Sequence, residues 1–391
     1  MTLFTKDEYL DRIEKTKKRM HSAGIEILIV SDPANMNYLT GYDGWSFYVP
    51  QVVAVAVDTD EPIWIGRGMD ANGAKQTTFL RAEDIIGYPD HYVQNPNKHP
   101  MNFVADQIKN RGWEKRSVGV EMDAYYFSAR GFSELQKDLP EATFKDANLL
   151  VSWVRIIKST QEINLMKQAG KIAERVMQTA IDTVSPGIRE CDAVAEVYRA
   201  QMRGTETFGG DYPAIVPMMP TGEKTATPHL TWTDDPYGNE TAVNLELAAC
   251  RHRYHSPLAR TVYLGANPPR KLTETAAIVV EGLDAALEAV KPGAKCEDIE
   301  LVWRRVIARA GLEKESRIGY SMGLNYPPDW GEHTASLRPG DKTVLQPNMT
   351  FHMILGMWLD DWGFECSESF RVTETGCETF ADFPRKLFIK N

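Results

Sequence analysis

Residues 183–204 read TVSPGIRECDAVAEVYRAQMRG, and residues 289–311 read AVKPGAKCEDIELVWRRVIARAG. In both copies a helical pattern reaches a Pro-Gly break, and a second helix with an acidic start follows before strand-like segments begin. Duplicated helix-helix-strand units related by pseudo-symmetry usually pack their strands into one sheet, with a ligand-binding cleft between the halves. The repeat therefore predicts a pseudo-symmetric domain of mixed α/β class; the alternative is chance similarity of two Pro-Gly-linked helices.

A long helix is expected directly before the first copy. Ser159 and Glu162 have the spacing of a capping box, in which each residue satisfies a backbone N–H of the other. Apolar residues follow at helical spacing on one face, namely Ile163, Met166, Ile172, Ala173 and Val176.

Helix and strand signals alternate through the first 153 residues, as is typical of a small α/β domain. Thr5 and Glu8 indicate a capping box for a helix that ends at Gly24. The expected strands are IEILIV (25–30), VVAVAV (52–57) and SVGVEM (117–122), with a loop at 31–50 and a helix at 127–139. We therefore divide the chain into domains 1–153 and 154–391. No G-x-G-x-x-G or P-loop motif is present, so a nucleotide cofactor is not indicated.

Composition excludes several classes of protein. The 391 residues are 43% hydrophobic and 25% charged, which is enough to build two domains with cores. The net charge of −10 and the absence of a long Lys/Arg run argue against nucleic acid. There is no apolar leader and no uncharged run of about eighteen apolar residues. The five cysteines form no CxxC pair, so we expect a soluble cytoplasmic protein with reduced thiols and no membrane contact.

The stretch NLELAACRHRYHSPLARTV (244–262) contains the first candidate for chemistry. Glu246 stands between Leu245 and Leu247. In a strand, neighbouring side chains point to opposite faces, so Glu246 should project away from both leucines. It either faces a ligand site or, as the alternative, points to solvent.

Several segments together resemble the creatinase/prolidase/methionine aminopeptidase family, whose catalytic domain has the pita-bread fold. They are NYLTGYDG (37–44) and VRIIKSTQEI (154–163), then TPHL (227–230), YHSPLARTV (254–262), GYSMGLNYPPDWGE (319–332) and SESFRVTETG (367–376). The resemblance covers nearly the whole chain. It implies a creatinase-type N-terminal domain, a pita-bread catalytic domain and a homodimer.

The resemblance also implies that the metal site of the family is lost. Family peptidases hold two metal ions with two Asp, one His and two Glu. The matching positions here are Glu246, Pro257, Tyr320, Ile354 and Ser367. Pro and Ile cannot be ligands, so we expect no metal and no other cofactor. A single ion held by His229, Glu246, His255 and Glu368 is the alternative.

Creatinase is a metal-free member of the family, and its histidine corresponds to His229. Its substrate-binding carboxylates correspond to Ala259 and Cys366, so the substrate should differ from creatine. The segments PPDWGEH (327–333) and WLDDWGFE (358–365) resemble the ectoine hydrolase branch. That branch implies hydrolytic opening of the cyclic amidine ectoine to N-acetyl-L-2,4-diaminobutyrate, with 5-hydroxyectoine as a further candidate substrate.

Amidine hydrolysis needs a nucleophile, a proton donor for the departing nitrogen and a carboxylate for the cation. Glu246 is expected either to hold the cation or to attack it, and His229 to act as general base or acid. We also include Glu368, for the cation or a catalytic proton, and His255, which strand alternation could equally turn outward.

Further residues are expected to bind the substrate through an O–H donor, carboxylates or aromatic faces. They are Tyr320, Trp330, Trp358, Trp362, Asp361, Glu365 and Trp45. A core position is the alternative for Tyr320 and for most of the rings. Arg260 and Lys224 are candidates for a substrate carboxylate. Arg260 is alternatively a structural ion-pair partner.

Three functions remain open from the sequence. The first is a metal-independent amidine hydrolase. The second is a metal-dependent Xaa-Pro aminopeptidase with an altered ligand set, and the third is an inactive binding protein. The clustered His, Glu and Trp residues favour catalysis.

Overall fold

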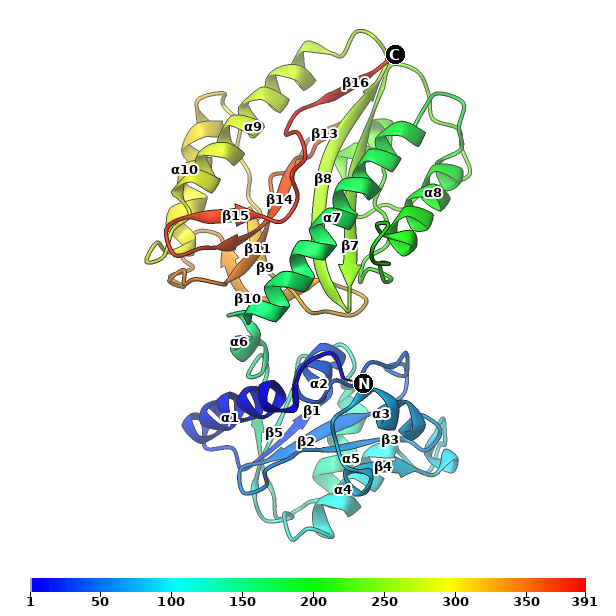
Figure 1. The fold of residues 1–391 in the computed structure, drawn as a ribbon, viewed down its shortest axis with the longest axis vertical. Helices are drawn as coiled ribbons and strands as arrows, with labels where there is room; N and C mark the ends of the chain where they lie inside the picture. The colour runs from blue at the N-terminus through cyan, green and yellow to red at the C-terminus, as the bar shows by residue number, and fades with distance from the viewer. Residues whose placement is uncertain (1) are drawn as a thin grey trace. The chain divides into compact units, whose positions relative to one another are not determined.

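Two units follow one another along the chain and divide between Arg155 and Ile156. The computed structural model describes residues 2–391 (Figure 1). Among these residues, no helix combines the length and the apolar character that a membrane crossing requires.

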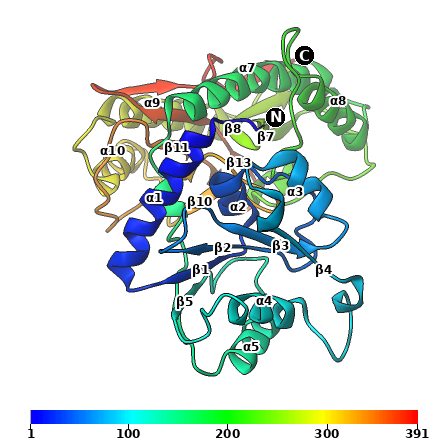
Figure 2. The same ribbon diagram turned by 60° about the horizontal axis from the view of Figure 1, so that its bottom comes forward.

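The first unit is built on one six-stranded sheet with the order β4-β3-β2-β1-β5-β6. Its strands are β1 (Ile27–Val30), β2 (Val52–Ala56), β3 (Ile63–Arg67), β4 (Ile85–Tyr88), β5 (Ser117–Val120) and β6 (Thr143–Asp146). Its helices are α1 (Lys6–Ala23), α2 (Pro33–Thr40), α3 (Ala71–Thr77), α4 (Pro100–Lys109), α5 (Ala129–Asp138) and α6 (Ser152–Arg155), with 3-10 turns η1 (Ala82–Asp84) and η2 (Asp90–Tyr92). β1 pairs antiparallel with β2 and parallel with β5. Alternate residues of the central strands pack on α4 and α5, which cover one face of the sheet (Figures 1 and 2).

Helix α2 corrects the loop that we expected at residues 31–50. The Asp32 carboxylate accepts hydrogen bonds from the N–H groups of Ala34 and Asn35 at 2.8 and 3.1 Å, and Pro33 occupies the first turn. Gly41 ends the helix with φ of 86°. Every residue of α2 is buried, so no polar face was present to reveal a helical period.

The caps of the two long helices differ from each other. Ser159 and Glu162 form the expected reciprocal capping box. Thr5 accepts a hydrogen bond from the Glu8 N–H at 3.3 Å, as predicted, but the Glu8 carboxylate binds Arg12 at 2.7 Å and does not return to the cap. The α1 box is therefore only half formed.

The second unit contains two helix pairs and three groups of strands. Its helices are α7 (Thr160–Thr183), α8 (Glu190–Arg203), α9 (Arg270–Ala289) and α10 (Cys296–Ala308), with the 3-10 turn η3 (Gly222–Ala226). Its strands are β7 (Thr241–Arg251), β8 (Tyr254–Leu264), β9 (Gly319–Met322), β10 (Gly331–Leu337), β11 (Thr350–Ile354), β12 (Met357–Trp358), β13 (Gly363–Phe364), β14 (Ser367–Val372), β15 (Cys377–Thr379) and β16 (Phe388–Lys390).

The internal repeat corresponds to the two helix pairs, α7 with α8 and α9 with α10. Each pair packs together, and in Figure 1 α7 and α8 lie beside the long β7–β8 hairpin. Gly187 and Gly293 follow the two prolines with φ of 85° and 88°, a backbone region that glycine adopts without strain. The predicted helix pairs are confirmed.

The prediction that both halves share one sheet is wrong. The strands form a sheet β16-β8-β7 and a separate sheet β10-β9-β11-β14-β15. Where β8 meets β14, side-chain hydroxyls replace a backbone ladder: Ser367 Oγ accepts from the Ala259 N–H at 2.7 Å, and Ser369 Oγ donates to Pro257 O at 2.6 Å. Pro257 has no N–H to offer a ladder.

Strand alternation separates two faces of the β7–β8 hairpin. Leu245 and Leu247 lie in the hydrophobic core beneath α7 and α8. Glu246 points the other way, and its cross-strand partner is Ala259. We call the face with Glu246, Ala259 and Ser367 the inner face.

Arg260 and Glu368 alternate with the inner-face residues Ala259 and Ser367, so they point to the other side. Their side chains form a buried ion pair at 2.6 Å, with exposures of 0% and 1%. Arg385 adds a second contact to Glu368 at 3.1 Å. Burial raises the pKa of Glu368, while both arginines act in the opposite direction. This ion pair links β8, β14 and the C-terminal segment.

Replacing Glu368 by Gln should destabilise the second unit by about 3 kcal/mol, because it leaves the buried Arg260 charge without its partner. Glu378→Gln is the matched control, since Glu378 forms half-exposed ion pairs with Lys167 and Arg371. Such a pair contributes about 1 kcal/mol or less. Denaturant unfolding of both variants measures the difference; equal midpoints would contradict the structural importance of the ion pair.

Candidate active site

Glu246 is the central carboxyl group of the inner face. Its backbone N–H and C=O pair with Met218 at 2.9 and 3.0 Å, which fixes the strand at this residue. The side chain is 8% exposed, and burial, Glu365 and Asp329 raise its pKa well above the usual value. Across residues 2–391 no group donates a hydrogen bond to this carboxyl, so its acceptor positions are open.

Glu365 is the second buried carboxyl group of this site. Trp358 Nε1–H donates to Glu365 Oε1 at 2.8 Å, while Oε2 is buried and has no partner among the described residues. Thr261 Oγ accepts from the Glu365 N–H at 2.9 Å and has two acceptors within reach of its single proton, Asn244 Oδ1 at 2.8 Å and the Glu365 carbonyl at 3.1 Å. Burial raises the pKa of Glu365 to about 7, against the opposing effects of Trp358 and Lys314.

Lys314 is a buried cation beside Glu365. Its ammonium lies 4.0 Å from the centre of the Trp358 ring and donates to Gly356 O. Burial lowers the pKa of Lys314 to about 8, although Glu365 acts to raise it. Lys314 and Trp358 also line a surface pocket of about 520 Å³. The site therefore holds one internal cation as well as two carboxyl groups.

Three side chains of the inner face form a hydrogen-bonded chain. The Tyr320 hydroxyl lies 3.1 Å from His352 Nδ1, and His352 Nε2 lies 2.8 Å from Ser367 Oγ. Trp330 Nε1–H donates to the Tyr320 oxygen at 2.8 Å. Tyr320 and His352 are direct cross-strand partners on β9 and β11, which places them side by side.

Apolar and charged groups surround this chain. Ala214, Ala248 and Trp330 form a small buried cluster on which Tyr320 packs. Arg317 lies 4.4 Å from the centre of the Tyr320 ring. Burial, with Arg317 as a further cause, lowers the pKa of His352 to about 3. His352 is therefore a neutral imidazole at ordinary pH.

Asp329 supplies a third carboxylate near Glu246 and Tyr320. Burial acts to raise its pKa, but hydrogen bonds from His333 at 2.8 Å and from the Gly331 N–H at 2.9 Å outweigh burial and lower the pKa. Asp329 is therefore ionised and already has donors, unlike Glu246.

The structure does not bring the expected catalytic residues together. Glu246 lies on the inner face, whereas Glu368 lies in the ion pair on the opposite side. His229 is exposed on the loop after η3 and takes no part in the buried hydrogen bonds that the structure describes.

His255 is fully buried, and backbone groups occupy both of its ring nitrogens. The Ala214 N–H donates to Nε2 at 2.8 Å, and Nδ1 lies 3.3 Å from Gly323 O. Burial lowers the pKa of His255 to about 4, so it is neutral. These contacts favour a structural role for His255 and for Glu368 over the catalytic roles that we expected.

The expected substrate-binding residues divide into three groups. Tyr320, Trp330, Trp358 and Glu365 belong to the buried network described above. Asp361 and Trp362 lie at the turn between β12 and β13, where Lys271 contacts the carboxylate at 3.5 Å and lies 5.1 Å from the Trp362 ring centre. Trp45 belongs to the first unit, is 58% exposed and packs on Phe47.

The two candidates for a substrate carboxylate both have protein partners. Arg260 is bound in the buried ion pair, as its structural alternative predicted. Lys224 lies 3.3 Å from Glu190.

The sequence did not point to His352, Lys314 or Arg317. For His352 a signal was available in strand alternation, because it lies two residues before Ile354 and so shares its face.

A metal ion does not fit these residues. Of the five positions matched to metal ligands, Pro257 and Ile354 carry no donor, and Tyr320 and Ser367 are used in hydrogen bonds to His352. Over residues 2–391 no three His, Cys, Asp or Glu side chains lie close enough to share an ion.

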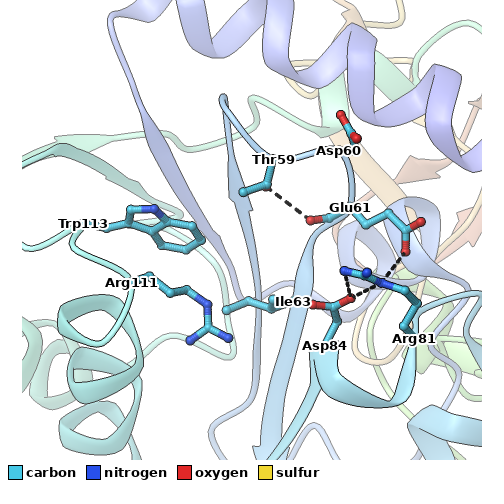
Figure 3. A pocket seen from close by; sticks show the side chains of 8 residues that line it. All are labelled: Thr59, Asp60, Glu61, Ile63, Arg81, Asp84, Arg111 and Trp113. Carbon is cyan, nitrogen blue, oxygen red and sulfur yellow. Dashed lines mark hydrogen bonds and ion pairs between the residues drawn. The ribbon is translucent and has the colours of Figure 1, made fainter.

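The first unit has a separate surface pocket of about 440 Å³, shown in Figure 3. Arg81 lies 2.8 Å from Asp84 and 3.9 Å from Glu61, so ion pairs link three of its charged side chains. One oxygen of Glu61 is buried and accepts no hydrogen bond among residues 2–391.

Comparison with known proteins agrees with the fold and with the family resemblance. Residues 164–374 match the family model for metallopeptidase family M24, and residues 12–157 match that for the creatinase/prolidase N-terminal domain. An ectoine hydrolase of Halomonas elongata is 48% identical, with 99% of this chain and 98% of that protein covered. An uncharacterized hydrolase/peptidase of Sinorhizobium fredii is 47% identical, with 99% of each chain covered.

Solved structures show the same architecture. A prolidase from Pyrococcus horikoshii has a TM-score of 0.80 at 22% identity and covers 96% of this chain and 99% of its own. A prolidase from Thermococcus sibiricus has a TM-score of 0.83 at 19% identity, with coverages of 97% and 99%. The chain belongs to metallopeptidase family M24, with a creatinase/prolidase N-terminal domain and a pita-bread catalytic domain, and it is a hydrolase.

Proposed function

We propose that this hydrolase opens the cyclic amidine ring of ectoine and releases N-acetyl-L-2,4-diaminobutyrate. The observation that carries the proposal is the pair of buried carboxyl groups, Glu246 and Glu365, with unfilled acceptor positions. An amidinium cation presents two N–H donors and a positive charge, and carboxylates bind such planar groups through charge-assisted hydrogen bonds. The name and 48% identity of the Halomonas elongata relative support the same substrate.

Charge favours a cationic ligand at this site. Burial raises the pKa values of Glu246 and Glu365, and the charge of Glu365 raises that of Glu246 further, so without a ligand they hold protons that exposed carboxyl groups would lose. A bound cation reverses this effect because it stabilises both ionised forms. Trp358 lies beside Glu365, and its ring already holds the Lys314 ammonium at 4.0 Å.

The substrate also carries a carboxylate, which needs a cationic partner. Arg317 is the best-placed candidate, because its guanidinium lies over the Tyr320 ring and donates to the neutral Ser336 hydroxyl at 3.2 Å, whereas Arg260 and Lys224 contact carboxylates. This assignment replaces Arg260 and Lys224 as binding candidates.

We further propose that the reaction is independent of metal. The positions matched to metal ligands offer a single carboxylate, Glu246, so the carbon–nitrogen bond must be broken by side chains and water. Glu246 either activates the water that attacks the amidine carbon or attacks that carbon itself. The competing function, a metal-dependent Xaa-Pro peptidase, would need a set of metal ligands, and residues 2–391 bring no three His, Cys, Asp or Glu side chains together.

The cellular setting follows the same proposal. We place the enzyme in the cytoplasm as a homodimer that takes a small-molecule substrate. All five cysteines are free, which suits a reducing compartment.

Purified protein mixed with ectoine and EDTA should open the ring, as followed by proton NMR. A Xaa-Pro dipeptide in the same buffer should stay intact. Loss of ectoine turnover in EDTA, with recovery on adding Mn²⁺ or Co²⁺, would contradict metal independence. No turnover with or without metal would contradict the substrate.

Glu246→Gln should lower kcat by a factor of about 10³ or more, because the amide can neither accept a proton nor attack carbon. Glu378→Gln keeps the same change of charge at a distant surface position and should leave kcat unaltered. Steady-state kinetics on both variants measures the effect. Retained activity in Glu246→Gln would remove Glu246 from the mechanism.

Glu246→Gln should also stabilise the protein at alkaline pH. The folded pKa of Glu246 is raised, so below the unfolded pKa the group is protonated in both states and adds no penalty. As pH rises through the folded pKa, the buried carboxylate must ionise and stability falls; Gln avoids this loss. The melting temperature of the variant should match wild type near pH 4 and exceed it near pH 8. A pH-independent difference would show that burial does not control this carboxyl.

A further inference from the structure

His352 can hold its ring proton in two ways within the hydrogen-bonded chain Trp330–Tyr320–His352–Ser367. Its two ring nitrogens carry one proton, because burial lowers the pKa of the imidazole to about 3. With the proton on Nε2, His352 donates to Ser367 Oγ and accepts from the Tyr320 O–H. With the proton on Nδ1, His352 donates to the Tyr320 oxygen and accepts from the Ser367 O–H.

The two states leave different protons without an acceptor. In the Nε2–H state, Ser367 Oγ accepts from both His352 and the Ala259 N–H, and its own proton has no acceptor among the described residues. Ser367 is 0% exposed, so neither solvent nor a ligand reaches that proton. A buried donor without an acceptor is unfavourable.

In the Nδ1–H state the spare proton is on Tyr320. Its oxygen accepts from His352 and from Trp330 Nε1–H, and its own O–H is left to donate elsewhere. Tyr320 is partly exposed, and Glu246 is one of the charged groups that act on it. Burial, Glu246 and Asp329 hold the pKa of Tyr320 well above 10, so the phenol keeps this proton.

We infer that His352 is a positioning residue that donates from Nδ1 to the Tyr320 oxygen, and thereby aims the Tyr320 O–H at the tetrahedral adduct of the substrate. The identity of the reaction rests on the function proposed above. The tautomer itself rests on the hydrogen bonds of this chain and on the neutral state of the buried imidazole, not on the substrate.

The chemistry of an amidine explains why such a donor would act late in the reaction. In the planar amidinium both nitrogens carry protons and delocalise their lone pairs, so the cation has no acceptor for Tyr320. After oxygen adds to the central carbon, that oxygen and the nitrogens hold localised lone pairs. The Tyr320 hydrogen bond therefore forms as the barrier is crossed, and it stabilises the transition state more than the bound substrate.

Tyr320→Phe should lower kcat on ectoine about 10²–10³-fold, as loss of one transition-state donor does, with KM nearly unchanged. A rise in KM at constant kcat would instead mean that Tyr320 binds the ground state, and it would overturn this role.

Two substitutions of His352 test its two ring nitrogens separately. The amide nitrogen of Asn overlies imidazole Nδ1, and that of Gln overlies Nε2. His352→Asn should therefore keep the donor to Tyr320 and most of kcat, whereas His352→Gln should lose kcat as Tyr320→Phe does. Both variants remove the same ring, so each controls for the other. Retained activity in Gln and loss in Asn would place the functional proton on His352 Nε2, facing Ser367, and overturn the inference.

NMR of protein labelled with ¹⁵N-histidine tests the tautomer without any substrate. The coupling pattern of the His352 signals should show hydrogen on Nδ1, with the signals assigned by their shift in Tyr320→Phe or their loss in a folded His352 variant. Hydrogen on Nε2 would overturn the inference. If wild type opens no ectoine yet His352 carries hydrogen on Nδ1, the proposed substrate fails while the tautomer stands.

Discussion

Burial of Glu246 without a hydrogen-bond donor is the constraint on which the inner face depends. Its neighbours Leu245 and Leu247 lie beneath α7 and α8, and each contributes about 1.5–3 kcal/mol by being buried. A buried polar group without a partner costs about 1–3 kcal/mol. The free energy gained by burying two leucines therefore exceeds the cost of burying one carboxyl group. Glu246 cannot turn to solvent without exposing the core. Apolar packing on one face thus holds an unpartnered carboxyl on the other.

Two hydroxyl groups of the inner face, those of Ser367 and Tyr320, contact the same histidine. Ser367 holds β14 to β8 through the Ala259 N–H and also contacts His352. Tyr320 contacts His352 from the neighbouring strand. These neutral groups satisfy one another's hydrogen bonds. The fold is that of solved prolidases, and the proposed metal-free chemistry depends on the residues of the inner face and not on the fold.

Local signals in the sequence predicted most of the fold. The Ser159 box, the Pro-Gly breaks and the alternation around Glu246 each depend on residues a few positions apart, and all three are present. Helix α2 was not predicted, because a fully buried helix has no polar face to mark its period. The division into two sheets was not predicted either, because it depends on hydroxyl groups that bind backbone atoms more than a hundred residues away in sequence.

The site was harder to predict than the fold for a related reason. Sequence similarity placed Glu368 beside the lost ligand, but a shift of one residue along a strand reverses the side on which it lies. Glu368 therefore meets Arg260, while Ser367 faces the site. His352 carried no motif of its own. Its importance arises from Tyr320 and Ser367, which come from the two strands that flank β11.

The two inner-face carboxyl groups differ in how many oxygens they can offer to a cation. Trp358 occupies one oxygen of Glu365 and leaves Oε2 open, whereas Glu246 has both oxygens free of donors within residues 2–391. An amidinium edge carries two N–H groups, so one from each carboxylate satisfies it. One Glu246 oxygen then remains. The proposed hydrolysis needs such an atom, whether to take a proton from water or to bond to the amidine carbon, and Glu365 has none to spare.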